Sequence, residues 1–418
     1  MPIRLPILRE RLAVLSAVVA VILALCVGVY HHGTVHQAWA MLRLPALSPL
    51  FADTRTITHS IDCLLSGQNP FIVRSFDPWY RLYNYPPIWL DLRYLGVTSR
   101  SSNLLGCLFA LMTVIAFLIL FRARTWLTAV IVFAAATSKA ILFGVERGNT
   151  DQVIFLLLIA GIFLIDHQKL AVRTALKSAL IVCLTVLKIF PVIAAIILVR
   201  NRKSTLWALL TVILSLAALK ITSGSQLPFV LANTPQDTFV SFGAFPFFTA
   251  VFSHSSHLLL EMVQHHVKAA SLGALLLAIL SVVAGLRFRE HLNRFLPPLD
   301  FEDSRGGIAA AGLAIFCLAF IRGSSYDYRL IFLMGAIAYL VEDLNQRKSL
   351  RAFPAAILFV LLLWKPANLS TGFELVDGLV FVAACAWLGT SLLDRLGLKL
   401  PAPRPQLSVP STDPVLQP

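Results

Sequence analysis

The chain has 418 residues, of which 58% are hydrophobic and 13% charged, and its formal net charge is +14 at pH 7. A soluble domain of this size cannot bury so much apolar surface, so the composition excludes a soluble globular protein and predicts an all-α polytopic membrane protein. The basic excess indicates membrane topology and anionic lipids as partners rather than nucleic acid, because Lys and Arg gather on the cytoplasmic side of membranes.

The first apolar segment, about 12–30, follows Arg4, Arg9 and Arg11 and is too long for a signal-peptide core. We interpret it as an uncleaved first span with a cytoplasmic N-terminus, in a bundle of about 10–12 transmembrane helices. The further predicted spans are 104–121, 126–144, 152–166, 173–199, 204–222, 268–287, 307–322, 328–342, 353–365 and 373–392.

The segment 173–199 has basic residues at both ends and allows two interpretations. A hairpin that bends at Lys188 and Pro191 would return both ends to the cytoplasmic side, as the positive-inside rule requires. The alternative is one long, tilted span of about 27 residues. We favour the hairpin.

Two long exterior loops are expected, at about 31–103 and 223–267, within a single membrane domain that covers 1–399. The Pro-rich tail, 400–418, is predicted to be disordered and cytoplasmic. The second loop contains four histidines, but no HExxH pattern accompanies them, so no metal ligand is assigned and a divalent cation stays possible. These histidines are His254, His257, His265 and His266.

Short polar motifs follow one another along the predicted exterior face. The first loop holds Asp53, a short amphipathic stretch, the pattern Leu-Leu-x-Gly-x-x-Pro-aromatic ending at Phe71, and Tyr-Pro-Pro at 85–87. Later come Gly-Asn-Thr-Asp-Gln at 148–152, Leu-Lys-Ile-Phe-Pro at 187–191 and Ser-Ser-Tyr-Asp-Tyr-Arg at 324–329. In this order the motifs resemble the family 87 glycosyltransferases, which are polyprenyl-phosphate-dependent membrane enzymes of the GT-C fold superfamily.

The resemblance implies a GT-C-like bundle that transfers a hexose or pentose, mannose-type first among them. The donor would be a polyprenyl-phosphate sugar, and the acceptor a hydroxyl of a lipid or glycan on the exterior face of a bacterial-type plasma membrane. Asp53 matches the general base of such enzymes and would take the proton of the acceptor hydroxyl as it attacks with inversion.

Asp53 has competing interpretations. It could instead cap the helix that begins beside it. Asp62 and Asp77 are rival bases from the same loop, although Asp77 precedes Pro78 as in a turn.

The leaving phosphate requires cations. In the hairpin topology Arg147 and Lys188 lie near the exterior ends of spans, where they could bind a lipid phosphate, and Arg329 and Arg322 could do the same. Snorkelling to lipid headgroups is the alternative fate of a basic residue near a helix end. Asp53, Arg147 and Lys188 are expected to converge on one cavity.

Sugar or acceptor contacts are expected from the polar residues around these cations. Glu146 and Asp151 could instead neutralise and orient Arg147, and Asp151 could cap the next helix. The tyrosines could stack on a sugar ring or anchor the chain at the membrane interface. The expected contact residues are Glu146, Asn149, Asp151, Tyr85, Asp327 and Tyr328.

Two other classes of function stay open. A transporter or flippase of a lipid-linked sugar or other small molecule would have a midplane site and broken helices. A non-enzymatic scaffold would have neither a site nor a reason to bury a charge such as Lys188.

Overall fold

Apolar runs of about 20 residues form long helices because a helix satisfies its own backbone hydrogen bonds inside lipid. A computed structural model describes residues 5–234, 240–253, 261, 267–347, 350–365 and 371–398. In this part of the chain seven helices are long and apolar enough to cross a membrane, so the prediction of an all-α polytopic membrane protein is confirmed. They contain α1 (Leu5–His32), α4 (Ser102–Leu120), α8 (Leu170–Leu187), α9 (Thr205–Ser223), α13 (Val267–Arg287), α15 (Ser304–Ile321) and α18 (Thr371–Arg395).

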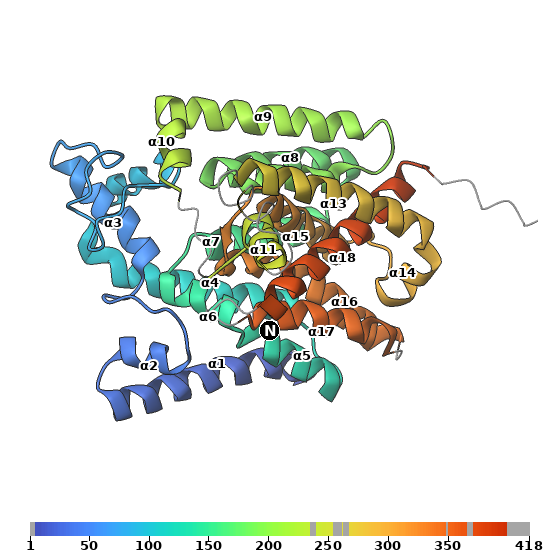
Figure 1. The fold of residues 1–418 in the computed structure, drawn as a ribbon, viewed down its shortest axis with the longest axis horizontal. Helices are drawn as coiled ribbons and strands as arrows, with labels where there is room; N and C mark the ends of the chain where they lie inside the picture. Colours follow the sequence, from blue (N-terminus) through green and yellow to red (C-terminus); the bar gives the residue numbers. More distant parts are fainter. Residues whose placement is uncertain are drawn as a thin grey trace, which may run out of the picture.

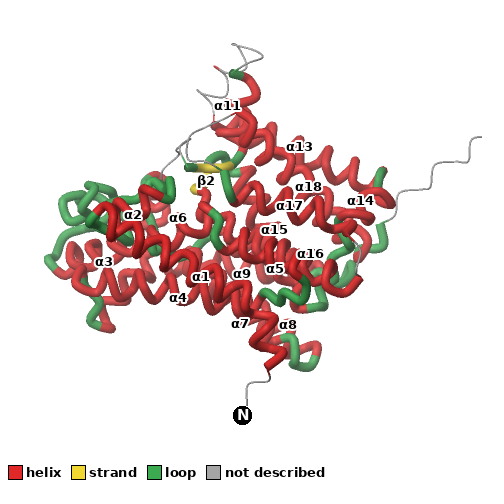
Figure 2. Tube along the Cα trace, turned by 90° about the horizontal axis from the view of Figure 1, so that it is seen from below, coloured by secondary structure: helices red, strands yellow, loops and turns green. Residues whose placement is uncertain are grey.

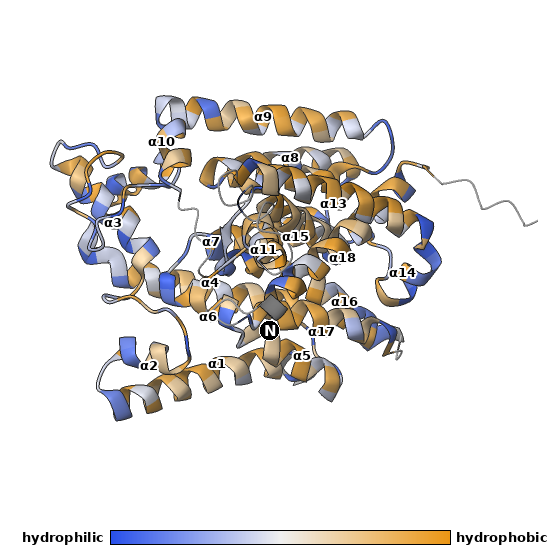
Figure 3. Ribbon diagram, in the orientation of Figure 1, coloured by the Kyte–Doolittle hydropathy of each residue, from blue (hydrophilic) through white to orange (hydrophobic). Residues whose placement is uncertain are grey.

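Helix α15 forms the centre of the bundle. Its apolar window is 72% buried, whereas the windows of α1, α9 and α13 are each 22% buried. Figure 1 accordingly shows α15 in the middle, with α9 along one edge and α1 along the other. The outer helix α9 is mostly apolar in Figure 3, with a hydrophilic band toward the α10 end, as suits a helix that faces lipid.

Fewer helices reach spanning length than the sequence predicts. The expected span 126–144 is bent by 41° between two shorter helices, which raises the number of candidate spans to eight at most. Hydropathy does not register such breaks, because the polar residues at the bend are few. The shorter helices in place of predicted spans are α5 (Trp126–Ala136), α6 (Lys139–Arg147), α7 (Asp151–Ile165), η5 (Asp327–Leu333), α16 (Met334–Arg347) and α17 (Phe353–Leu363).

The predicted hairpin at Lys188 is confirmed. Helix α8 ends at Leu187, Lys188 is extended, and the 3-10 helix η3 (Phe190–Leu198) begins with Pro191. The Arg200 guanidinium donates to the Thr174 hydroxyl at 3.1 Å. Because residue 174 lies near the start of α8, the chain has returned to the end at which it entered.

Ion pairs join residues of the predicted cytoplasmic segments at one end of the bundle. Arg124 pairs with Glu10 at 3.0 Å and with Glu342 at 3.7 Å. Lys177 pairs with Asp166 at 2.6 Å. Helix α7 ends at this end beside Asp166, and α8 runs from this end to the other. The turn that precedes α7 and Lys188, which follows α8, therefore lie together at the opposite end.

The two long loops are largely structured at that opposite end. A short antiparallel ribbon joins the second loop to the segment before η5, with Ser241 opposite Tyr326 and Phe242 opposite Ser325 (Figure 2). The predicted tail 400–418 and the four loop histidines lie outside the described residues. The remaining elements are α2 (Val35–Met41), α3 (Ala52–Leu65), η1 (Pro87–Leu95), η2 (Ser99–Ser101), η4 (Gly224–Gln226), α10 (Leu227–Ala232), β1 (Ser241–Phe242), α11 (Ala244–Phe252), α14 (Arg289–Phe295), β2 (Ser325–Tyr326) and η6 (Leu350–Ala352).

Candidate functional site

The turn between α6 and α7 is locked to the start of α3. Gly148 has a φ of +59°, which ends α6 and reverses the chain. The Thr54 hydroxyl donates to the Gly148 carbonyl at 2.7 Å, and the Phe51 amide donates to the Glu146 carbonyl at 3.0 Å. The first loop and this turn therefore form one unit.

Gly148→Ala is expected to destabilise the protein strongly. A Cβ at Gly148 would lie 2.3 Å from the Thr54 hydroxyl, and Ala also resists a positive φ. We expect a loss of about 3 kcal/mol, combining about 1–2 kcal/mol of backbone strain with about 1–3 kcal/mol of overpacking. Thermal unfolding in detergent measures this loss. The control is Gly67→Ala, where φ is +80° and the space is empty, so equal losses would contradict the steric explanation.

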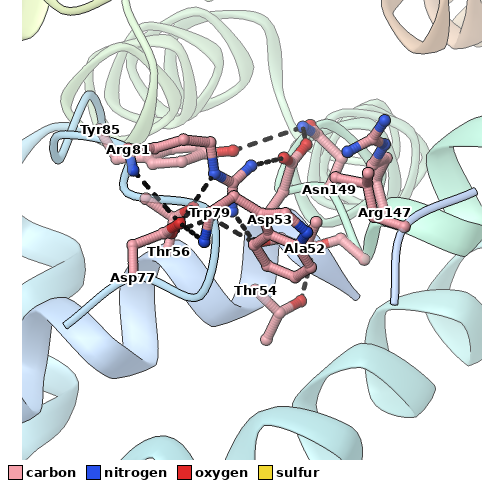
Figure 4. Close-up of polar contacts among 12 residues, drawn as sticks. Ala52, Asp53, Thr54, Thr56, Asp77, Trp79, Arg81, Tyr85, Arg147 and Asn149 are labelled. Carbon is pink, nitrogen blue, oxygen red and sulfur yellow. Dashed lines mark hydrogen bonds and ion pairs between the residues drawn. The ribbon is translucent and has the colours of Figure 1, made fainter. Parts of the chain in front are cut away.

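Asp53 lies in the first turn of α3 but does not cap the helix. The cap position belongs to Phe51, with a φ of 62°, and no side chain caps the helix. The Asp53 Oδ2 atom accepts a hydrogen bond from Asn149 Nδ2 at 2.5 Å, and Oδ1 lies 3.4 Å from Arg81 Nη1 (Figure 4). The side chain thus points toward Asn149 and Arg81, and the capping interpretation is wrong.

Arg81 is a site residue that the sequence reasoning missed. Its guanidinium binds Asp77 at 3.2 and 3.0 Å and donates to the Ala52 carbonyl at 2.6 Å (Figure 4). Burial lowers the pKa of Arg81, but Asp53 and Asp77 together outweigh burial and raise it. A signal was available, since Asp77 and Arg81 are four residues apart in an otherwise aromatic stretch.

Asp53 lines a cavity of about 350 Å³ at this end of the bundle. This volume lies within the range of about 300–1,000 Å³ that is usual for small-molecule sites. Its wall is basic and aromatic. The residues that matter most for the chemistry are Asp53, Arg74, Arg81, Tyr85, Arg147 and Tyr328.

A second, smaller cavity of about 60 Å³ adjoins the first. Lys188, Arg322 and Arg329 line it together with apolar residues such as Phe190. Both cavities share Tyr85, Tyr326 and Tyr328 in their linings, so these three residues lie between the cavity that holds the Asp53 carboxylate and the cavity that holds Lys188. We call them the tyrosine wall.

The rival acids from the first loop have structural roles. Asp62 accepts from the Ser99 amide at 3.3 and 3.2 Å and so holds the start of η2. Asp77 accepts from the Trp79 amide at 2.8 Å, which confirms that it forms a turn. Neither acid is among the lining residues of the two described cavities, whereas Asp53 is.

Lys188 is buried at the centre of a polar network. Its Nζ atom lies 2.9 Å from Asp151 Oδ1 and donates to Asn149 Oδ1 at 3.2 Å and to Thr150 Oγ1 at 3.1 Å. Asn149 therefore bridges Asp53 and Lys188, one at each end of its side-chain amide. Asp53 and Lys188 thus lie close together, but the expected convergence of Asp53, Arg147 and Lys188 on one cavity is wrong, because Asp53 and Arg147 line the larger cavity and Lys188 lines the smaller one.

Asp151 pairs with the cations of the second cavity instead of with Arg147. Besides Lys188, it lies 3.7 Å from Arg329 Nε. The helix cap is Thr150, and the Asp151 side chain makes no capping bond. The predictions that Asp151 orients Arg147 or caps α7 are therefore wrong, because the carboxylate turns toward the stronger cation cluster.

Arg329 and Arg322 complete that cluster. Arg329 donates to the Ser325 hydroxyl at 2.9 Å, and its guanidinium lies 4.3 Å from the Phe190 ring centroid. Arg322 lies 5.9 Å from the same ring. For the Arg322 side chain the structure gives no hydrogen bond or ion pair within the described part of the chain, so its charge is available to a ligand.

Arg147 lies on the other side of the tyrosine wall from Lys188. It lines the larger cavity, pairs with Glu146 at 3.3 Å and donates to the Pro45 carbonyl at 3.1 Å. Glu146 thus neutralises Arg147, as one interpretation of the sequence expected. The three predicted phosphate ligands are consequently divided between the two cavities.

The residues predicted to contact the sugar or the acceptor fall into two groups, those that line the cavities and those that are buried behind them. Tyr85 and Tyr328 line both cavities, whereas Glu146, Asn149 and Asp151 are at most 2% exposed and lie behind the cavity surface. Burial first, and then Asp53, raises the pKa of Tyr85 well above its ordinary value, so its hydroxyl stays protonated and can donate.

Asp327 lies away from both cavities, beside Lys365. Burial raises its pKa from an ordinary value of 3.8 to about 6, with Lys365 lowering it and Glu374 raising it. The folded chain thus binds this proton more tightly than the unfolded chain. The resulting stability is complete below about pH 4 and is lost as the pH rises through about 6.

Asp327→Asn is therefore expected to stabilise the protein at pH 7 and to have no effect at pH 4. The expected gain is about 3 kcal/mol, because a pKa shift of one is worth about 1.4 kcal/mol. Thermal unfolding of both proteins in detergent from pH 4 to pH 8 measures it. A difference that does not depend on pH would contradict the assignment.

Among the described residues, no group of three or more His, Cys, Asp or Glu side chains could hold a metal ion. Comparisons with protein-family models, with curated proteins and with solved structures find no match for this chain. What the site can do is therefore inferred from its own residues and their geometry.

Proposed function

We propose that the protein is a membrane glycosyltransferase that moves a sugar from a polyprenyl-phosphate donor to a hydroxyl of a lipid or glycan. The single observation that carries the proposal is the pair of adjoining cavities. One cavity presents a carboxylate, Asp53, and the other presents three cations, Lys188, Arg322 and Arg329. A sugar transfer from a phosphate ester needs these two chemistries side by side.

The division of charge suggests where each substrate binds. Of the three cations that line the smaller cavity, Lys188 and Arg329 share one carboxylate, Asp151, which lies behind the lining, and this leaves positive charge for a donor phosphate. The apolar residues beside them suit the first part of a lipid chain. The acceptor would occupy the larger cavity, and the tyrosine wall would hold the transferred ring by stacking at their junction.

In the proposed reaction the acceptor hydroxyl attacks the anomeric carbon while Asp53 takes its proton. The bond from the anomeric carbon to the phosphate oxygen breaks, and the phosphate keeps the electron pair. Lys188, Arg322 and Arg329 stabilise the charge that develops there. One displacement of this kind inverts the anomeric configuration. The contact from Arg81 to Asp53 is long, at 3.4 Å, so an arriving hydroxyl can displace it.

Donor turnover tests the proposal. Purified protein in lipid is incubated with a panel of polyprenyl-phosphate sugars and a mixture of lipid and glycan acceptors, and consumption of each donor is followed. We expect one donor to be consumed and a glycosylated product to form. If the wild-type protein and Asp53→Ala consume every donor at the same background rate, the proposal fails.

A transporter or flippase of a lipid-linked sugar is the second candidate, and the broken helices favour it. Helices α5 and α6 form a pair bent by 41°, and α8 is interrupted at Lys188 beside the cation cluster. Transporters commonly build substrate sites from such discontinuous helices. Sealed vesicles separate the two candidates, because a flippase moves the intact donor across the membrane whereas a transferase releases polyprenyl phosphate.

A further inference from the structure

A second buried charge cluster lies where α17 ends and α18 begins. Lys365 Nζ lies 2.8 Å from Glu374 Oε1 and 2.8 Å from Asp377 Oδ2. All three residues are at most 5% exposed. Charges are expensive to bury, so a cluster that no cavity of the proposed reaction uses requires another explanation.

Lys365 also contacts the ribbon that joins the second loop to the site. Its Nζ atom donates to the Ser241 carbonyl at 2.8 Å. Ser241 lies opposite Tyr326 in the ribbon, and the Asp327 amide donates to the Val240 carbonyl at 3.0 Å. Because β1 pairs with β2, the hydrogen bond from Lys365 to Ser241 in β1 also restrains β2.

The ribbon holds one residue of the tyrosine wall, Tyr326, and a second, Tyr328, follows two residues later in η5. Tyr326 and Tyr328 flank Asp327, and their side chains contact each other at a ring distance of 5.5 Å. The backbone segments next to the ribbon pack closely against each other, since a Cβ at Gly243 would lie 2.3 Å from the Gly323 carbonyl oxygen. The position of the wall thus depends on β1, and Lys365 holds β1 through its hydrogen bond to Ser241.

The charges around Lys365 favour this anchoring role over simple charge balance. Glu374 and Asp377 already outnumber the single cation, and Asp327 adds a third buried carboxylate beside it. Lys139 and Arg43 face Asp327 across a narrow cavity. The Lys365 ammonium donates to the Ser241 carbonyl and to Asp377, and it pairs with Glu374 at 2.8 Å, which fixes the relative positions of β1 and α18.

We propose that Lys365 is a positioning residue that holds the tyrosine wall between the two cavities by joining β1 to the start of α18. The consequence for sugar transfer rests on the proposed function, whereas the position of the wall can be measured without any reaction. Displacing the wall would merge the cavity of Asp53 with the cavity of Lys188 and remove the stacking surface.

Labelling of Tyr326→Cys by a small maleimide reports the position of the wall. The exposed native cysteines, Cys26, Cys107 and Cys183, are first replaced by Ser. We expect Lys365→Met to raise the labelling rate at least tenfold. That variant leaves the buried carboxylates of Glu374 and Asp377 without their cation. A triple variant therefore combines Lys365→Met with Glu374→Gln and Asp377→Asn, so that none of the three side chains is charged.

The neutral triple variant decides between positioning and charge balance. We expect it to unfold at nearly the wild-type temperature and yet to label as fast as Lys365→Met. The matched control carries Glu374→Gln and Asp377→Asn alone; it keeps the bond from Lys365 to Ser241 and is expected to label at the wild-type rate.

If the triple variant labels at the wild-type rate, Lys365 only balances charge and the proposal is wrong. Donor turnover is measured separately on the wild-type protein. Its absence would remove the proposed function but would leave the labelling result unchanged.

Discussion

Asp53→Asn is expected to lower the rate of donor consumption about 100-fold to 10,000-fold while the protein remains folded. The substitution keeps the shape of the side chain but removes the base, and general base catalysis contributes about this much. The amide can still occupy the space between Asn149 and Arg81, where the carboxylate now lies. Single-turnover kinetics in lipid, with saturating acceptor, measures the chemical step.

The other two acids of the first loop provide the controls for Asp53. Asp62→Asn is expected to retain the wild-type rate, since Asp62 holds the Ser99 amide and lines neither cavity. Asp77→Asn is expected to lose part of the rate, because it loosens Arg81, which contacts Asp53. A larger loss in Asp62→Asn than in Asp53→Asn would exclude Asp53 as the base.

Lys188→Met is expected to weaken both the fold and the binding of polyprenyl phosphate. Removing one partner of a buried ion pair costs about 3–5 kcal/mol, because the remaining charge is left without compensation. Asp151 would retain only Arg329, at 3.7 Å. Thermal unfolding in detergent measures stability, and binding of a short-chain polyprenyl phosphate measures affinity.

Lys177→Met is the matched control for this experiment. Lys177 is equally buried and pairs with Asp166 at 2.6 Å, but at the opposite end of the bundle. We expect a similar loss of stability and unchanged phosphate affinity. If both variants lose affinity equally, the effect of Lys188→Met is one of folding, and the proposed phosphate site is not supported.

The fold class and the hairpin could be predicted because each follows from strong, local physical constraints. Composition alone requires a membrane protein. At 173–199 the basic ends must remain outside the lipid, and Pro191 cannot continue a helix, so the break falls at Lys188. The short motifs were also sufficient to predict that Asp53 and Lys188 would lie close together.

The pairing of charges could not be predicted, because it depends on the way in which distant segments meet. Asp151 and Arg147 are close in sequence, yet they lie on a turn that directs one toward Lys188 and the other toward Glu146. Lys365 follows the apolar helix α17, and the sequence alone does not indicate its partners. Its buried partners and its contact with the ribbon become visible only in three dimensions.

The lock between the first loop and the turn around Gly148 dictates an order of assembly. Asp53 can meet Arg81 as soon as the first loop has been made, since both belong to it. Its bond to Asn149 must wait until α4, α5 and α6 have been synthesised and inserted. In an unfinished chain Asp53 therefore has only one of its two partners, and the two cavities are complete only when synthesis has passed Arg329.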